Sequence, residues 1–124
     1  MRVFIALVLV FLALFAVPFF VYGAFSSLSG LQPPGDDAVR FLLGVAVSKL
    51  GTAFAFVGIW LLGRDMLARQ AGIYVFLWLV MFMLGEVGQA LGPEYSWQEA
   101  FAGMISEALY FPLAGLILVR VLPA

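Results

Sequence analysis

The chain contains no cysteine and no histidine. Without cysteine, disulfide bonds, thiolate nucleophiles and cysteine-ligated metals are excluded. Without histidine, the commonest metal ligand and the commonest base near neutral pH are also missing. We therefore expect neither a metal site nor a bound cofactor.

Charge is almost as scarce, since only 10% of the residues are charged and the formal net charge is −1. The few lysines and arginines form no cluster along the chain. A protein that binds nucleic acid needs a concentrated positive surface to neutralise phosphates. Nucleic acid is therefore excluded as a partner.

Apolar residues make up 65% of the 124 residues, and the mean hydropathy is +1.15. A soluble domain of this composition would leave too much apolar surface in water, so the composition indicates a membrane protein whose main partner is the lipid bilayer. Runs of the roughly 20 apolar residues that span a bilayer occur at about 3–25, 38–63, 71–91 and 98–122. We predict an all-α, single-domain, integral membrane four-helix bundle over residues 1–124.

The connections between the runs carry helix-ending and helix-starting signals. Residues 33–35 are Pro-Pro-Gly, which cannot continue a helix, and Asp36 or Asp37 can cap the second span. Ser96 and Glu99 have the spacing of a capping box at the start of the fourth span. The middle connection is short and predicts that the second and third spans are antiparallel neighbours; it reads GRDMLARQ.

Basic residues are distributed asymmetrically along the chain. An even number of spans places both termini and the middle connection on one side, and the positive-inside rule makes that side cytoplasmic. The residues concerned are Arg2, Arg64, Arg69 and Arg120. We predict an N-in/C-in multi-pass protein of the bacterial cytoplasmic (inner) membrane, with Trp60 and Tyr74 near its inner aromatic belt. Its outer belt would hold Tyr22, Tyr95 and Trp97.

Three ionisable residues fall inside the predicted spans: Lys49, Glu86 and Glu107. At about 1.5 Å per residue, they lie about 17, about 8 and about 14 Å below the outer surface. Each charge would cost about 2.5–3.5 kcal/mol at a helix centre, so we expect the three to meet partners. Lys49 needs a carboxylate or a water-filled cavity, and Glu107 matches its depth.

Helical spacing places polar groups on common faces. Glu86 shares a face of the third span with Trp78, Phe82 and Gln89. Glu107 shares a face of the fourth span with Gly103, Tyr110 and Ala114, and Ser106 lies beside it. Arg40, at the outer end of the second span, could pair with Glu86.

These residues support three different functions. In the first, Lys49, Glu86 and Glu107 form a buried ion cluster that fixes the packing of an accessory or lipophilic-ligand-binding protein. The ligand-binding residues would then be Trp78, Gln89, Tyr110, Arg40 and Ser106. Such a protein could form a homo-oligomer or join a larger membrane complex.

In the second, Glu86 and Glu107 are the acid and base of a membrane enzyme and Lys49 tunes them. Its substrate would be a lipophilic epoxide, isoprenoid or quinone. The third function is a small proton-coupled transporter. Small multidrug transporters have similar length, but their essential glutamate lies in the first span, which here has no ionisable group except Tyr22.

For residues 1 to about 24, a cleaved signal peptide is the alternative to a first span.

Part of the chain resembles the DoxX-like and related small four-helix bacterial membrane proteins. The resemblance covers about residues 36–119. It rests on the short arginine-bearing loop and on three segments: DDAVRFLLGVAVSKLG, LGEVGQALG and ISEALYFPLAGLIL. Many such proteins have an arginine where this chain has Glu86, and that arginine can pair with the glutamate matched by Glu107. The resemblance implies accessory, assembly or redox-associated roles in a membrane. The acid at position 86 departs from that pattern and makes a carboxylate pair.

Overall fold

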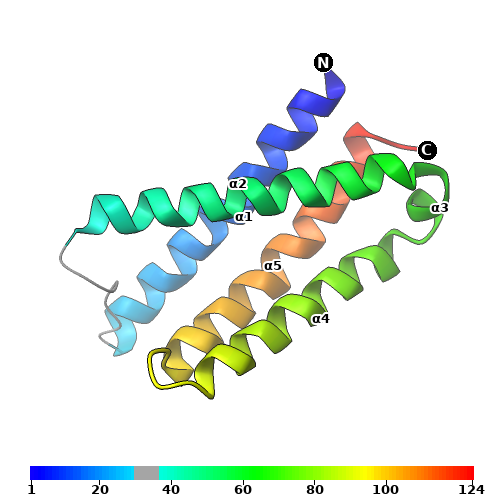
Figure 1. Cartoon of the computed structure of the whole chain (residues 1–124). Coiled ribbons are helices and arrows are strands. Elements are labelled where there is room, and N and C mark those ends of the chain that lie inside the picture. Colours follow the sequence, from blue (N-terminus) through cyan, green and yellow to red (C-terminus); the bar gives the residue numbers. More distant parts are fainter. Residues whose placement is uncertain (30–36) are drawn as a thin grey trace.

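The computed structural model describes residues 1–29 and 37–124, and all regular structure in these two ranges is helical (Figure 1). Four of the helices are long and apolar enough to cross a membrane, which confirms that the chain has the character of a multi-pass membrane protein. The five helices are α1 (Arg2–Ser29), α2 (Ala38–Leu62), α3 (Arg64–Arg69), α4 (Ala71–Ala90) and α5 (Trp97–Val121).

Two of the predicted helix caps are present. Asp37 accepts a hydrogen bond from the backbone N–H of Arg40 at 3.1 Å, and Ser96 accepts one from the backbone N–H of Glu99 at 3.1 Å. Both bonds satisfy amide groups that have no partner inside the first helical turn. The predicted turn at residues 33–35 and the alternative cap Asp36 lie outside the described residues.

The first helix is longer than a bilayer requires. Its 28 residues span about 42 Å, against a hydrocarbon thickness of about 30 Å. A helix of this length fits the hydrocarbon layer by tilting. Pro18 lies inside α1 and Pro112 inside α5, and both helices continue past their proline.

The packing of the helices departs from the prediction for one pair of spans. α5 packs against both α1 and α4, and α2 packs against α1. α2 and α4 make little backbone contact, so they are not the close antiparallel neighbours that the short connection predicted. The connection itself folds as the short helix α3, and the two long helices diverge from that corner (Figure 1).

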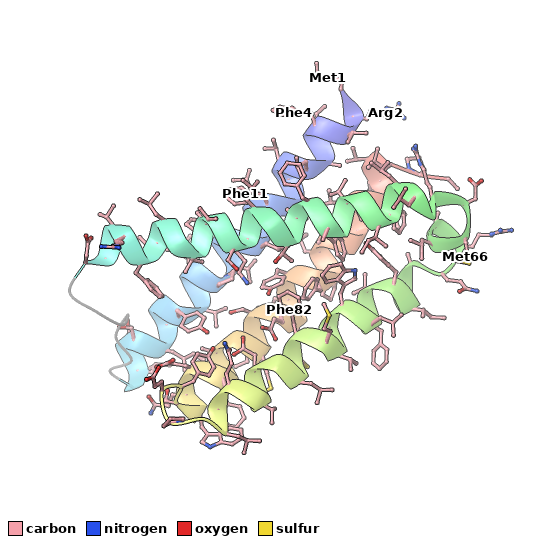
Figure 2. All side chains as sticks on the ribbon, in the orientation of Figure 1. Met1, Arg2, Phe4, Phe11, Met66 and Phe82 are labelled. Carbon is pink, nitrogen blue, oxygen red and sulfur yellow. The ribbon has the colours of Figure 1, made fainter. Side chains whose placement is uncertain are left out.

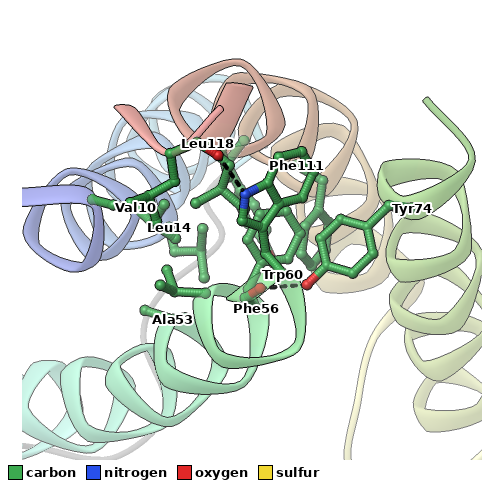
Figure 3. Packing of buried hydrophobic residues seen from close by; sticks show 13 residues of the cluster. Val10, Leu14, Ala53, Phe56, Trp60, Tyr74, Phe111 and Leu118 are labelled. Carbon is green, nitrogen blue, oxygen red and sulfur yellow. Dashed lines mark hydrogen bonds between the residues drawn. The ribbon is translucent and has the colours of Figure 1, made fainter. Parts of the chain in front are cut away.

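Large aromatic side chains form the centre of the core (Figure 3). Trp60 is fully buried and donates from its indole N–H to the carbonyl of Leu122 at 2.9 Å, while Tyr74 donates to the carbonyl of Phe56. Both rings therefore have their polar group satisfied inside the protein. The prediction that Trp60 and Tyr74 belong to an aromatic belt facing the membrane is wrong, because each is a core residue.

The outside of the molecule is apolar over most of its length. Phe20, Leu62 and Leu84 expose more than half of their surface, and many other large apolar side chains do the same. Both termini and α3 lie towards one end of the molecule, and the α4–α5 connection lies at the other (Figure 1). A hydrogen bond of 2.6 Å from Arg64 to the carbonyl of Pro123 ties the C-terminus to the α3 corner.

Candidate functional site

Two glutamates from neighbouring helices meet in the interface between α4 and α5. Glu86 lies on α4, and Glu107 lies on α5 with only 3% of its surface exposed. Gly103, one turn before Glu107, provides the room, since a Cβ atom there would overlap the Glu86 carboxyl group. The two carboxyl groups come within hydrogen-bonding reach of each other. A hydrogen bond between two carboxyl groups requires a proton on one of them.

The second oxygen of Glu86 is bound from the α4–α5 connection. The Tyr95 hydroxyl donates to Glu86 Oε2 at 2.5 Å and lies 3.3 Å from the hydroxyl of Tyr22 on α1. Tyr22 in turn donates to the carbonyl of Glu99 at 3.1 Å. Burial raises the pKa of Tyr95 well above its usual range, and the hydrogen bond to Glu86 raises it further. Tyr95 therefore remains a neutral donor to the carboxyl pair.

Lys49 approaches the pair from α2 but does not bind it. Its ammonium group donates to the hydroxyl of Tyr110 at 3.0 Å, and it lies 4.8 Å from the centre of the Tyr110 ring and 5.8 Å from that of Phe82. Aromatic faces attract a cation at such distances. Within the described residues no ion pair joins Lys49 to either glutamate, so the expected carboxylate partner is replaced by a tyrosine.

A cavity of about 410 Å³ opens beside the two carboxyl groups. Its wall combines two carboxyl groups, one carboxamide and apolar side chains, from Met81, Phe82, Gly85, Glu86, Gln89 and Glu107. Met81, Gly85 and Gln89 are exposed, whereas Glu107 is buried at the inner end. Phe82, labelled in Figure 2, lies among the side chains between α4 and α5 and stacks edge-on against Phe111 at 4.9 Å.

One buried polar atom beside this cavity has no hydrogen-bond partner among the described residues. Glu107 Oε1 is buried and accepts no hydrogen bond from the described residues. A buried acceptor that loses its water without gaining a donor costs about 1–3 kcal/mol, and more if it is charged. This oxygen is closed off from the cavity, so the acceptors that the cavity offers to a donor are the other polar groups of its wall.

The other residues predicted to bind a ligand lie outside the cavity wall. Trp78 packs in the core against Phe56 and Phe111, and Ser106 is buried with its hydroxyl bound to the carbonyl of Ala102 at 2.7 Å. Arg40 is exposed at the start of α2. Tyr110 holds Lys49 instead of facing the cavity. The fold therefore brings Glu86, Gln89 and Glu107 together and keeps the remaining candidates apart from them.

Sequence reasoning missed Tyr95 as part of the site. It stands nine residues after Glu86, beyond the end of α4, where no helical periodicity links the two positions. Met81 and Gly85 were also missed, because an apolar residue and a glycine carry no chemical signal. Their one-turn spacing before Gln89 becomes informative only once the position of the cavity is known.

The described residues contain no group of three or more acidic side chains that could hold a metal ion. The cavity instead offers hydrogen-bond acceptors and an apolar wall. Comparisons with protein-family models, curated proteins and solved structures gave no match. The function is therefore inferred from the geometry of the site.

Proposed function

We propose that this protein binds a lipophilic small molecule whose polar head donates hydrogen bonds to Glu86 and Glu107. The head occupies the cavity between α4 and α5, and the apolar tail lies along the exposed side of α4. Gln89 borders the same cavity and contributes a carboxamide to the head-group contacts. The observation that carries this proposal is the open cavity whose wall brings together the carboxyl groups of Glu86 and Glu107 and the carboxamide of Gln89.

The proposed setting is a four-helix bundle in the cytoplasmic membrane with both termini inside. The arginines near both termini and in the middle connection support this orientation, because positive charge accumulates on the cytoplasmic side. In this orientation the α4–α5 connection and Tyr95 face outward. The role is that of an accessory protein, alone or within a larger membrane complex, in keeping with the resemblance to DoxX-like proteins.

Mass spectrometry of the purified protein tests the binding function. Wild-type protein extracted in mild detergent should carry a lipophilic molecule, which organic extraction would release for identification. Glu107→Gln keeps the shape of the side chain but removes its acid, and it should lower the amount of bound molecule about tenfold, equivalent to about 1.4 kcal/mol.

The matched control is Glu94→Gln, which removes the same charge from an exposed position in the α4–α5 connection. This variant should retain the wild-type amount of the molecule. Equal occupancy in folded wild-type and Glu107→Gln protein would contradict the proposal.

Acid and base catalysis on the bound molecule is a second candidate function. It is favoured by the continuous contact from Tyr95 through Glu86 to Glu107, in which one carboxyl group can give a proton while the other accepts one. Incubating the extracted molecule with fresh protein should then change its mass. Glu86→Gln should abolish the change while Glu94→Gln should not, and an unchanged molecule would rule out catalysis.

A further inference from the structure

The charges around the cavity restrict the chemical class of the ligand's polar head group. We infer that the ligand is an amphiphile with a single primary ammonium head, and that its binding expels the proton shared by Glu86 and Glu107. This inference rests on the proposed binding function and adds the chemical class of the ligand and its coupling to a proton.

The cavity wall provides acceptors and no cation. Its polar groups are two carboxyl groups and the carboxamide of Gln89, and none of the lining residues is basic. A primary ammonium group has three N–H donors and no acceptor, so it can bond to several carboxyl and carboxamide oxygens of the cavity wall at once. A hydroxyl has one donor, and a carboxylate or phosphate head would meet two acids.

Lys49 does not fill the role of this cation. Its ammonium group is held by the Tyr110 hydroxyl and lies against two aromatic rings, and among the described residues it forms no ion pair with Glu86 or Glu107. An ammonium delivered by a ligand would therefore occupy a position that the chain leaves open.

The cost of a net charge in the protein interior then couples ligand binding to the release of a proton. A net charge is costly in a low-dielectric interior, so a site that gains one positive charge is favoured if it loses another. The shared proton of the glutamate pair is the charge that can leave. Exchange of one proton for one ammonium keeps the net charge of the site constant. The charge on Lys49 is common to both states and does not alter this balance.

The groups that face the pair come from every neighbouring element: Tyr22 of α1, Lys49 of α2, Tyr95 of the connection and Tyr110 of α5. Tyr95 touches Glu86 and lies in the connection at the end of the molecule, beside Tyr22. A proton released from the pair therefore has a hydrogen-bonded route towards that surface.

Calorimetry with two simple probes tests the inference in non-ionic detergent. Decylamine carries a primary ammonium, and decanol carries a hydroxyl on the same chain. Titration in buffers with different ionisation enthalpies gives the number of protons released on binding. Wild-type protein should release one proton per decylamine, and its dissociation constant should fall about tenfold per pH unit between about pH 6 and about pH 8. An alkylammonium, like that of lysine, stays charged over this range.

Variants and the second probe separate the outcomes. Glu86→Gln and Glu107→Gln cannot share a proton between acids, so each should bind decylamine at least tenfold more weakly and release no proton. Glu94→Gln should match the wild type in both affinity and proton release.

Decylamine binding to wild type without proton release, or decanol binding as tightly as decylamine, would overturn the inference while the binding function stands. If neither probe binds and no molecule co-purifies with the protein, the binding function fails and the inference fails with it. The pH series needs only wild-type protein, so it decides the matter even if a variant does not fold.

Discussion

At the scale of single residues, the site depends on a glycine that has no chemistry of its own. Gly103 lets the Glu86 carboxyl group lie against α5, next to Glu107. Gly115, three turns further along the same helix, admits the side chain of Val75 in the same way. Substitutions at Gly103 and Gly115 can therefore test the site and the packing of α5 separately.

We expect Gly103→Ala and Gly115→Ala to have different effects. The new Cβ at position 103 meets the end of a flexible glutamate, which can move away, so stability should fall by no more than about 1 kcal/mol while ligand binding weakens about tenfold. The Cβ at position 115 meets Val75, whose branched side chain is stiff, and should cost about 1–3 kcal/mol. Ligand binding by the folded fraction should remain.

Unfolding in mixed micelles, followed by circular dichroism, and ligand occupancy measure these two effects. Gly51→Ala is the control, because a Cβ at position 51 meets no atom within 4 Å. If Gly103→Ala leaves ligand binding intact, the close approach of Glu86 to α5 is not required for the site.

Tyr95 should make stability sensitive to alkaline pH. Its pKa is raised in the folded protein from the ordinary value of 10.0, so the folded state keeps the proton that the unfolded chain loses above about pH 10. The free energy of unfolding should therefore fall as the pH rises beyond that point. Tyr95→Phe should make this fall shallower, as shown by unfolding at a series of pH values. Identical slopes for the two proteins above pH 10 would contradict the role of Tyr95 as a buried neutral donor.

At the scale of helices, the buried side chains of α2 lie in only one of its halves. Its buried residues all lie in the half that leads to α3: Ala53, Phe56, Val57 and Trp60. Phe56 is fully buried against the rings of Tyr74, Trp78 and Phe111 at 5.0, 5.5 and 5.8 Å. The half of α2 before Ala53 contributes no residue to the buried core.

Phe56→Ala should therefore loosen α2 strongly. Removal of a buried phenylalanine costs about 3–5 kcal/mol, because it loses transfer energy and leaves a cavity. Phe54→Ala is the matched control, since Phe54 lies on the same helix with 58% of its surface exposed. It should change the free energy of unfolding by less than about 1 kcal/mol. Equal losses in the two variants would show that α2 is not held through the Phe56 ring cluster.

The sequence predicted the long helices well and their packing poorly. The apolar runs and the caps at Asp37 and Ser96 are local signals, and the helices begin and end within a few residues of the expected positions. The partner of a helix depends instead on which side chains fill the gap between two backbones. The burial of Trp60 and the divergence of α2 from α4 were therefore not predictable from periodicity alone.

The candidate site, like the packing, was predictable only in part. The third and fourth spans each present a glutamate on one face, and the fold brings Glu86 and Glu107 together. The pairing of Lys49 with Tyr110 depends on the angle at which α2 crosses the other helices, which the sequence does not encode locally. The contact of Tyr95 depends on the path of a connection outside any helix.

At the scale of the whole molecule, the orientation in the membrane is open to a direct test. Because the chain has no native cysteine, single cysteines can be introduced one at a time. Glu94→Cys in the α4–α5 connection should react with an impermeant maleimide in intact cells. Met66→Cys, exposed on α3, should react only after the membrane is opened. The reverse pattern would contradict the N-in/C-in orientation.

The whole wall of the cavity comes from a single helical hairpin, and this has a consequence for folding. All the residues that line it belong to α4 and α5, which a short connection joins. Contacts between elements so close in sequence form quickly, because little chain entropy is lost in closing the loop. The wall of the cavity is therefore complete once this hairpin has formed. α1 and α2, which come earlier in the chain, place Tyr22 and Lys49 outside that wall when they pack against the hairpin.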